Sequence, residues 1–262
     1  MGPVNRTERA ALAAETDRLV AEGRYGPVPA STLHLPEDPL PEPGPAGPST
    51  VEVTDETSLA ACRRLASAAP DQVACLNFAS AKNPGGGYAT GAHAQEESLA
   101  RSSALAATLR TASGFYDHHR SHRDPVYSDR VIHSPDVPVF RDDTGLLVGP
   151  YRVAFLTAAA PNAGALREPV DLSGVLRRRA GRVLGVALAH GHRRLVLGAW
   201  GCGVFRNDPR QVAAAFAGLL GPDGRYADRF TLVVFAVPDP TNRRPFAEAF
   251  LNGRSATGYG PA

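Results

Sequence analysis

Residues 73–97 read VACLNFASAKNPGGGYATGAHAQEE, and this stretch decides which kind of fold the chain has. It begins with an apolar run over Val73–Phe78, which is too short for most helices and suits a strand buried in a parallel sheet. A glycine-rich loop follows, and two adjacent carboxylates, Glu96 and Glu97, stand at the start of a predicted helix. A buried strand that leads through such a loop into a helix indicates an α/β sheet that binds a ligand at the ends of its strands.

The loop and the two carboxylates suit the chemistry of a phosphorylated sugar. Gly85, Gly86 and Gly87 permit positive φ angles and a close approach of the backbone to a ligand, and consecutive amides can form an anion-binding concavity. A carboxylate pair is typical of glycosidic-bond hydrolysis. Adjacent helical residues point about 100° apart, so we expect one carboxylate to hold the sugar and the other to move the proton. An isolated Glu-Glu pair is also an ordinary solvated helix start, and it is the preceding strand and loop that favour function.

A second loop of the same kind follows the predicted strand Leu195–Ala199. It contains Gly201, Cys202 and Gly203 and leads into Asp208–Pro209, where the Asp can cap a helix and the Pro fits its first turn. The two loops together have the arrangement expected for clasping a diphosphate between amides and helix N-termini. Neither loop is a P-loop, because no GK[ST] follows, and Arg206 stands where a dinucleotide-binding fingerprint needs Gly or Ala.

Strands and helices alternate after residue 50, which predicts an α/β fold with a mixed, mostly parallel sheet covered by helices on both faces. We expect an N-terminal helix over residues 6–22, begun by Asn5 and ended by Gly23, and an extended Pro/Gly-rich connection over residues 36–50. Residues 1–50 are interpreted as an extension packed on one domain of residues 51–262, and residues 254–262 as a loose tail. The predicted strands are Val51–Val53, Val73–Phe78, Val131–Ser134, Val153–Ala158, Leu195–Ala199 and Phe230–Val237. The predicted helices are Ser58–Ser67, Glu96–Thr111, Leu172–Ala189, Pro209–Leu219 and Arg244–Leu251.

Composition narrows the function classes. The chain has 262 residues, 43% of them hydrophobic, and a net charge of +2, so it can bury a large core and is not expected to bind DNA directly through a broad basic surface. The N-terminus lacks a signal-peptide apolar region and no apolar stretch approaches 18 residues, so we expect a cytoplasmic protein without a membrane span. The cysteines suggest neither a disulfide framework nor a zinc site. His118, His119 and His122 lack a recognised ligand spacing and are interpreted as part of a solvated loop.

Three segments, taken together, resemble the bacterial-type poly(ADP-ribose) glycohydrolases, which are built on a macrodomain. The first is GGG, seven residues and QEE, in residues 85–97. The second is GAWGCGVFRNDP in residues 198–209. The third is HSPDVPVFRDD in residues 133–143, followed by AAAPN in residues 158–162. The resemblance covers most of the chain after about residue 50, with matching order and spacing.

This resemblance implies a macrodomain-like fold and a role for each carboxylate. It implies that Glu97 is the general acid/base and that Glu96 binds the distal ribose, while Phe205 packs on the ligand. A general acid must hold its proton near neutral pH, so we expect substrate binding to raise the pKa of the catalytic carboxyl. The predicted site comprises the catalytic Glu96 and Glu97 and the substrate-binding residues Asn77, Asn83, Gly85, Gly86, Gly87, Gln95, Gly201, Cys202, Gly203, Val204 and Phe205.

The sequence leaves three functions open. The first is a hydrolase that cleaves ribose–ribose O-glycosidic bonds in poly(ADP-ribose) and needs no metal or organic cofactor. The second is a macrodomain that binds ADP-ribose without cleaving it, and the third is a hydrolase of mono-ADP-ribosylated protein. The presence of both glutamates favours an enzyme, because a reader needs the glycine loops but not the acid. Its partner would be poly(ADP-ribose) or an ADP-ribosylated protein, and we expect it to act as a monomer.

Overall fold

The computed structural model describes residues 4–44, 47–68, 73–168 and 170–251. Its strands are β1 (Thr32–His34), β2 (Thr50–Thr54), β3 (Val73–Phe78), β4 (Val131–Arg141), β5 (Leu147–Ala158), β6 (Arg194–Leu197) and β7 (Leu232–Ala236). Its helices are α1 (Arg6–Ala21), α2 (Ser58–Ala68), α3 (Gln95–Ser102), α4 (Leu105–Arg110), α5 (Ser113–Ser121), α6 (Ser173–Ala189), α7 (Pro209–Leu220) and α8 (Pro240–Leu251), with 3-10 turns at Tyr88–Thr90 and Ala163–Ala165. The tail expected over residues 254–262 lies outside the described residues.

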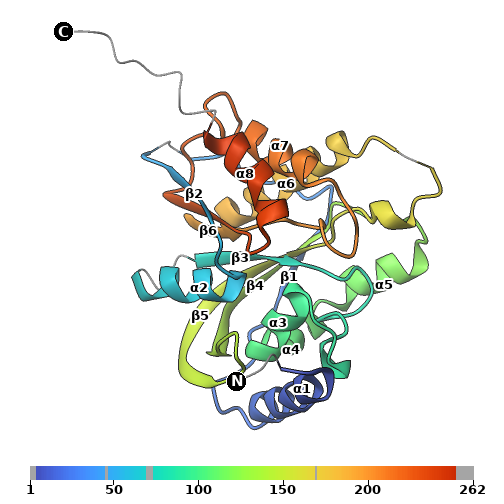
Figure 1. The fold of residues 1–262 in the computed structure, drawn as a ribbon, viewed down its shortest axis with the longest axis vertical. Coiled ribbons are helices and arrows are strands. Elements are labelled where there is room, and N and C mark those ends of the chain that lie inside the picture. Colours follow the sequence, from blue (N-terminus) through green and yellow to red (C-terminus); the bar gives the residue numbers. More distant parts are fainter. Residues whose placement is uncertain (1–3, 45–46, 69–72, 169, 252–262) are drawn as a thin grey trace.

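The strands form one mixed sheet in the order β1-β4-β5-β3-β6-β7-β2 (Figure 1). Neighbours from β5 through β2 run parallel, whereas β4 pairs antiparallel with β5 and β1 pairs antiparallel with β4. The predicted mixed, mostly parallel sheet is confirmed. Because β3 and β6 are parallel neighbours, the two glycine-rich loops that follow them leave the same edge of the sheet side by side.

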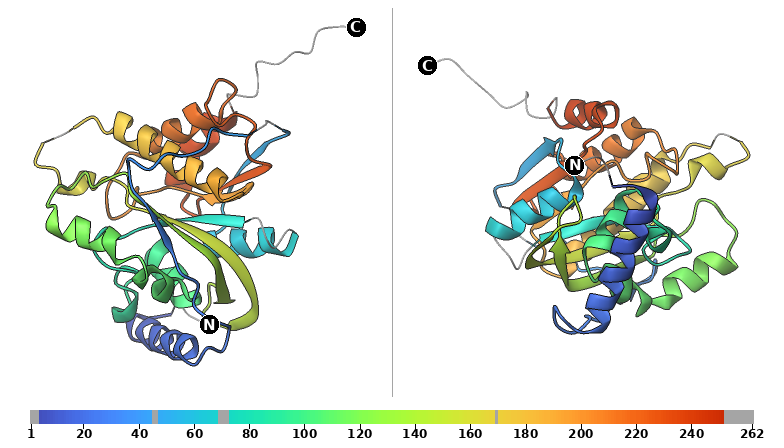
Figure 2. Two further views of the ribbon diagram at one scale, coloured as in Figure 1. Left: turned by 180° about the vertical axis from the view of Figure 1, so that it is seen from behind. Right: turned by 60° about the horizontal axis from the view of Figure 1, so that its bottom comes forward.

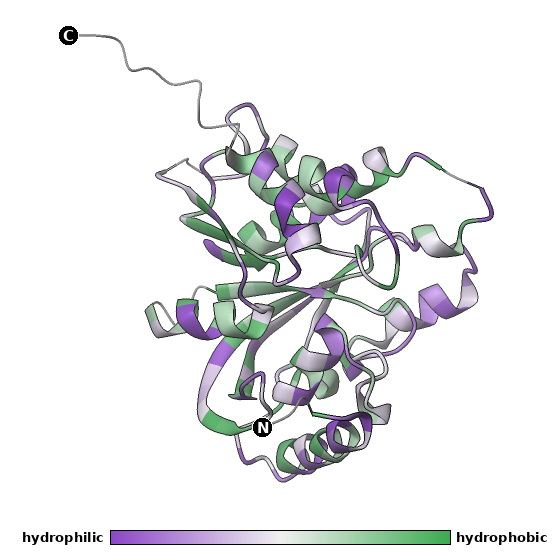
Figure 3. Ribbon diagram, viewed as in Figure 1, coloured by the Kyte–Doolittle hydropathy of each residue, from purple (hydrophilic) through white to green (hydrophobic). Residues whose placement is uncertain are grey.

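Helices cover both faces of this sheet. Helices α6, α7 and α8 lie on one face, α2 to α5 lie on the other, and α1 packs outside α3 (Figures 1 and 2). Side chains alternate along β3, so that Ala74 and Leu76 join the core under α6 and α7, while Val73 and Cys75 join the core under α2 and α3. Figure 3 shows the apolar residues concentrated in the strands between the two helical layers.

The helix predicted over Glu96–Thr111 is wrong as one continuous helix. The chain forms α3 and α4 instead, interrupted at Ser103, which has extended dihedrals (φ −150°, ψ 176°). Ser103 pairs with Val139 of β4 in an isolated bridge, and the N–H of Ala104 donates to the carbonyl of Pro138 at 3.1 Å. The sheet therefore takes the backbone groups that would have continued the helix.

The strands predicted at Val131–Ser134 and Val153–Ala158 are parts of a much longer hairpin formed by β4 and β5. Pro138 lies inside β4 although proline removes a ladder donor. Beyond His133 the outer edge of β4 is no longer paired with β1, and the carbonyl of Pro138 faces Ala104 there, so the missing N–H of Pro138 lies on that side and costs no bond to β5. A register shift with Asp136 at φ 45° bends the strand there.

Helix α5 corrects the expected solvated loop around the three histidines. It includes His118 and His119, and the side chain of His119 is 1% exposed, packs against Phe115 and shares a 2.9 Å hydrogen bond with the hydroxyl of Ser128. An aromatic residue and a histidine four positions apart share one face of a helix, which anchors α5 on the core. Across the described ranges, no group of three or more His, Cys, Asp or Glu side chains is arranged to hold a metal ion.

The N-terminal helix is confirmed with its predicted cap. The Asn5 side chain accepts from the N–H of Glu8, the Glu8 carboxylate accepts from the N–H of Asn5, and Gly23 continues at φ 67° after the last turn. Strand β1 of the same N-terminal segment is hydrogen-bonded into the sheet, which the sequence does not predict. None of the described helices is long and apolar enough to cross a membrane.

Candidate active site

A cleft of about 500 Å³ opens at the carboxyl ends of β3 and β6, between the two glycine-rich loops. Ten of the predicted site residues line it, and they come from both loops and from the start of α3. They are Asn83, Gly86, Gly87, Gln95, Glu96, Glu97, Gly201, Gly203, Val204 and Phe205. Val204 is 80% exposed, which places an apolar side chain in contact with solvent at this cleft.

Gln95 fixes the start of α3 on β3. Its side-chain carbonyl accepts from the N–H of Phe78 at 2.9 Å, and its amide donates to the carbonyl of Leu76 at 2.8 Å and to the Ser58 hydroxyl at 3.1 Å. These bonds satisfy β3 backbone groups as the strand ends and hold the first turn of α3 in one position. The two glutamates that follow are therefore carried by a rigid support.

Glu96 is the buried member of the pair, with a side chain only 3% exposed. One carboxylate oxygen accepts from the amide of Asn77 at 3.1 Å and the other from the N–H of Ser80 at 2.6 Å. Burial raises the pKa of Glu96 to about 8, a shift that these hydrogen bonds oppose and the nearby Glu97 reinforces. Glu96 is therefore mostly protonated at neutral pH, and it can offer a carboxylic O–H to a ligand.

Glu97 occupies a more open position beside the first glycine loop. Its carboxylate accepts from the N–H of Gly87 at 3.0 Å. A Cβ added at Gly86 would collide with Glu97 Oε1 and would lie 3.0 Å from Glu96 Oε2, so both carboxyls converge on the same glycine. Because Gly86 also has φ +60°, this position requires glycine for backbone conformation as well as for space.

The two glycine loops use their amides differently. In the first loop the N–H of Gly86 donates to the carbonyl of Asn83, and the N–H of Gly87 is taken by Glu97. In the second loop the N–H groups of Gly201 and of residues 203–205 have no acceptor within the described chain. The first loop thus orients the carboxyls, while the second keeps several backbone donors available for an anion.

Three predicted site residues do not line the cleft. Asn77 follows the alternation of β3 onto the α3 side, where it is fully buried beneath Glu96 and also bonds Thr157 at 3.2 Å. Gly85 is buried, and a Cβ added to it would lie only 2.9 Å from the ring of Tyr88. The Cys202 thiol turns back into the protein, where burial raises its pKa to about 12, which makes it a poor nucleophile.

Tyr127 lines the cleft although sequence reasoning did not predict it. Its ring lies 5.8 Å from that of Phe205, centroid to centroid, so the two aromatics face the same space. Tyr127 has φ 61°, a conformation that non-glycine residues rarely adopt and that is enriched at active sites. The sequence around it, DPVYSD, resembles an ordinary polar turn, so the only available signal was a lone aromatic residue in it.

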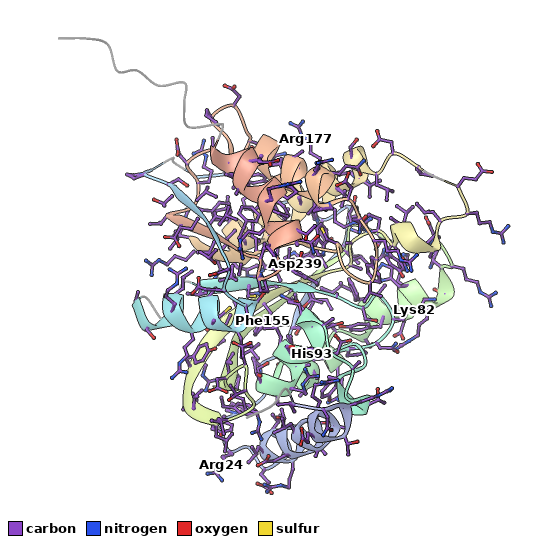
Figure 4. All side chains as sticks on the ribbon, in the orientation of Figure 1. Arg24, Lys82, His93, Phe155, Arg177 and Asp239 are labelled. Carbon is purple, nitrogen blue, oxygen red and sulfur yellow. The ribbon has the colours of Figure 1, made fainter. Side chains whose placement is uncertain are left out.

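Lys82, Phe78 and Ser80 were also missed, and all three belong to the segment that leaves β3. Lys82 is exposed (Figure 4) and brings a positive charge to a cleft that contains two carboxyl groups. Their position immediately after a strand that ends at a binding edge was the signal that could have identified them.

An α/β sheet whose strand ends carry a buried neutral carboxyl, an open carboxyl and a loop of available amides defines a macrodomain-like glycosidase. Comparison with known proteins agrees with this class. Residues 5–142 match the family described as microbial-type PARG, catalytic domain, where PARG denotes poly(ADP-ribose) glycohydrolase. The chain therefore belongs to the microbial-type poly(ADP-ribose) glycohydrolases, and it is an enzyme rather than a reader.

Solved structures extend the likeness over nearly the whole chain. The poly(ADP-ribose) glycohydrolase from Thermomonospora curvata is 52% identical, covers 94% of this chain and 100% of its own, and has a TM-score of 0.87. The same enzyme bound to the inhibitor ADP-HPD gives a TM-score of 0.85 at 52% identity, over the same shares of the two chains. The Deinococcus radiodurans enzyme in complex with ADP-ribose is 42% identical over 89% of this chain and 97% of its own, with a TM-score of 0.78. No curated protein matched the chain.

Proposed function

We propose that Glu97 is the general acid/base of the glycohydrolase reaction and that Glu96 orients the ribose on which it acts. Glu97 gives its proton to the leaving oxygen as the bond between that oxygen and the anomeric carbon breaks. Water then adds to the oxocarbenium-like carbon and gives a proton to the Glu97 carboxylate. The products are one free ADP-ribose unit and a polymer that is shorter by that unit and ends in a ribose hydroxyl.

The observation that carries this proposal is the convergence of both carboxyls on Gly86 at the wall of one cleft. Glu97 is the more open member of the pair. Glu96 is 3% exposed and its oxygens accept from Asn77 and Ser80, so its carboxylic O–H at the cleft wall is the group that can face a ribose hydroxyl. Asn77 is a positioning residue in this scheme, since it bonds Glu96 from below and does not line the cleft.

The protonated state of Glu96 supports its role as a holding group. A neutral carboxyl avoids placing a second negative charge beside Glu97 and near an anionic substrate, and it can donate to a ribose hydroxyl. We expected a raised pKa on the catalytic carboxyl once substrate is bound. In the free protein, burial raises the pKa of Glu96 to about 8.

The second glycine loop is proposed to bind the diphosphate of the terminal ADP-ribose unit. Its available N–H groups at Gly201 and residues 203–205 are suited to an anion, whereas in the first loop the N–H of Gly86 is bound to the Asn83 carbonyl and that of Gly87 to Glu97. The rings of Phe205 and Tyr127 would then pack against the ribose or adenine. This arrangement fits a ligand of the class bound by the Deinococcus radiodurans enzyme, ADP-ribose.

The first prediction concerns Glu97→Gln. The amide keeps the size and the bond from Gly87 but cannot donate an acidic proton, so we expect kcat on poly(ADP-ribose) to fall at least 1,000-fold, roughly 4 kcal/mol of transition-state stabilisation. Binding of ADP-ribose, measured by calorimetry, should change by less than about threefold. The matched control is Glu37→Gln, which alters an exposed carboxylate outside the cleft and should leave both values unchanged.

Turnover by Glu97→Gln within tenfold of the wild-type rate would remove Glu97 from the mechanism. Release of ADP-ribose from mono-ADP-ribosylated protein, and not from the polymer, would instead favour the narrower hydrolase.

We further propose that the protein acts as a cytoplasmic monomer without direct DNA binding and that residues 51–262 carry the catalytic site. Light scattering tests the monomeric state, and cell fractionation tests the location. A DNA-binding assay tests the third point, and the activity of a chain lacking residues 1–50 tests the fourth.

A further inference from the structure

A second cleft, of about 550 Å³, runs along the outer face of α6 and is distinct from the active-site cleft. We call it the α6 cleft, and α6 contributes Gly174, Arg177, Arg178, Gly181 and Arg182 to it. These residues are spaced i, i+3, i+4, i+7 and i+8, so they form one stripe along the helix. At 1.5 Å per residue the stripe is about 12 Å long.

The lining of the α6 cleft is strongly basic. Arg177, Arg178 and Arg182 face Arg225 across it, and the single carboxylate of the lining is Asp129. Asp129 is already bonded by Arg178 and by Arg179, which lowers the pKa of Asp129 and leaves it no charge to offer the other arginines. Since the whole chain carries only +2, this concentration of arginine is a local feature of one helix face.

Arg178 and Arg182 are held by bonds to other parts of the protein, whereas Arg177 and Arg225 are available to bind an anion. Arg182 donates to the backbone carbonyls of Leu35 and Asp38, so it fixes the segment after β1 and keeps its charge in the cleft. Arg177 is exposed and has no hydrogen-bond or ion-pair partner in the part of the chain that the structure describes. Arg225 pairs with Glu42, but both side chains are more than half exposed, so the pair is easily exchanged for another anion.

The floor of the cleft is apolar, and Leu40, Leu219 and the ring of Tyr226 contribute to it. Arginines around an apolar and aromatic floor are suited to a ligand that alternates phosphates with flat, weakly polar rings. The chemistry indicated is a nucleotide or a chain of nucleotides.

The α6 cleft adjoins the active site. Asp129 belongs to its wall, while Tyr127, two residues earlier, belongs to the wall of the active-site cleft. Two trans peptide units span at most about 7 Å between Cα atoms. A polymer whose end is bound beside Tyr127 therefore has its next units within reach of the arginines of α6.

From this placement we propose that the α6 cleft binds the poly(ADP-ribose) chain outside the active site, through its diphosphates. The inference rests on the proposed function, since it takes the polymer end to lie in the neighbouring cleft. Holding the chain at two places raises its effective concentration at the second, so long polymers gain affinity that a short fragment cannot. A nucleic acid lacks this tether, which is why the polymer is favoured as the occupant.

The test compares two double variants with equal changes in charge. Arg177→Glu with Arg225→Glu reverses the two available charges of the cleft. Arg18→Glu with Arg24→Glu is the control, because Arg18 also forms an exposed ion pair and Arg24 is exposed at the other end of the molecule from Arg177 (Figure 4). Each variant is assayed on long poly(ADP-ribose) and on a two-unit fragment, over a range of salt concentrations.

We expect the cleft variant to lower kcat/KM on long chains about tenfold, through KM, and to leave the fragment within twofold of wild type. The slope of log KM against log salt on long chains should fall by about one for each phosphate that the arginines no longer neutralise. The control should change neither substrate by more than twofold. Melting temperatures should match, because neither changed side chain of the cleft variant anchors the fold.

Two results would overturn the proposal. One is an unchanged kcat/KM on long chains in the cleft variant, and the other is an equal loss on chains and fragment. A loss of duplex DNA binding with normal polymer turnover would assign the cleft to nucleic acid instead. The readout is the ratio of kcat/KM on the two substrates, so it tests the α6 cleft even if Glu97 proves not to be the acid. Inactivity of the wild type on both substrates would refute the proposed function itself.

Discussion

Glu96 and Glu97 are neighbours in the chain and differ in every physical respect that matters for catalysis. At the scale of single residues, one side chain turns under the sheet edge and bonds Asn77 and Ser80, while the other meets Gly87 at the open cleft. The buried carboxyl is neutral at pH 7 because no cation lies beside it to compensate its desolvation. A division of labour between adjacent residues thus arises from a difference in burial.

Glu96→Gln should stabilise the protein while it impairs the enzyme. The folded-state pKa of Glu96, about 8, lies above its ordinary value of 4.5, so the folded state holds a proton that the unfolded chain releases as pH rises between these values. At about 1.4 kcal/mol per pH unit over the interval from pH 4.5 to pH 7, glutamine should gain roughly 3 kcal/mol at pH 7. Its nitrogen can face Asn77, whose side-chain oxygen has no partner in the described structure.

Urea unfolding of both proteins at pH 4.5 and pH 7.5 measures this effect. Most of the advantage of glutamine should be lost at pH 4.5, where the folded wild type is protonated and its unfolded chain is about half protonated at Glu96. An advantage that is equal at both pH values would show that packing, and not ionisation, separates the two proteins. Wild-type Glu96 loses its proton near pH 8 and glutamine cannot, so the variant should lack any fall in kcat/KM that this ionisation causes.

At the scale of elements, the first glycine loop and the start of α3 act as one unit. The loop has the conformation that Gly85 and Gly86 permit, at φ +76° and +60°, and Gln95 locks the helix onto β3. The N–H of Gly87 in the loop then holds the Glu97 carboxylate in place. Catalytic geometry here depends on a contact between two elements ten residues apart in sequence.

Gly86→Ala should separate catalysis from folding. The added methyl would collide with Glu97 and crowd Glu96, so we expect kcat/KM to fall more than 100-fold, while positive φ costs the fold only about 1–2 kcal/mol. Gly149→Ala is the control, since nothing lies within 4 Å of its added Cβ and its φ is not positive. Half or more of the wild-type activity in Gly86→Ala, at an unchanged melting temperature, would contradict the assigned convergence.

At the scale of the whole molecule, four histidines join distant parts of the chain. His34 of β1 meets His190 after α6, with their Nε2 atoms 2.9 Å apart, and His133 of β4 meets His192 in the same way. The rings of His133 and His190 stack with centroids 3.7 Å apart. The cluster ties the N-terminal strand and the antiparallel edge of the sheet to the turn between α6 and β6.

Burial keeps this cluster of histidines neutral. Burial, followed by the other histidines, lowers the pKa of His133 to about 3, and burial lowers that of His192 to about 4. Asp38 and Arg182 face His34 with opposite signs, and Asp136 faces His192 without reversing the effect of burial.

The protein should therefore lose stability as pH falls below 6.5. The unfolded chain takes up protons near pH 6.5 that the folded cluster refuses until pH 4 or lower, so each such histidine costs about 1.4 kcal/mol per pH unit in that window. In His133→Gln the free energy of unfolding should fall less steeply between pH 6 and pH 5, by about this amount. Equal slopes in urea titrations of the two proteins would place the acid sensitivity elsewhere.

Local patterns were enough to predict much of the site. The strand Val73–Phe78, the glycine turns, the capped start of α7 at Asp208 and the position of Glu97 all depend on residues close together in sequence. Val73 and Cys75 face the helices α2 and α3, and continuing this alternation to the end of β3 would also have placed Asn77 beneath α3. Tyr127 could not be found this way, because its place in the cleft depends on a turn packed against the second loop.

By itself the sequence determined the class of fold and the two glycine-rich loops, and it located the carboxyls that we propose as catalytic, since strand periodicity, glycine conformation and helix capping are set over a few residues. Only the tertiary structure decided that α3 ends at Ser103, that Glu96 is buried and neutral, and that the arginines of α6 gather beside the active site. Each of these depends on desolvation or on backbone bonds between segments far apart in the chain. A pattern over a few residues does not show which distant segments will pack against it.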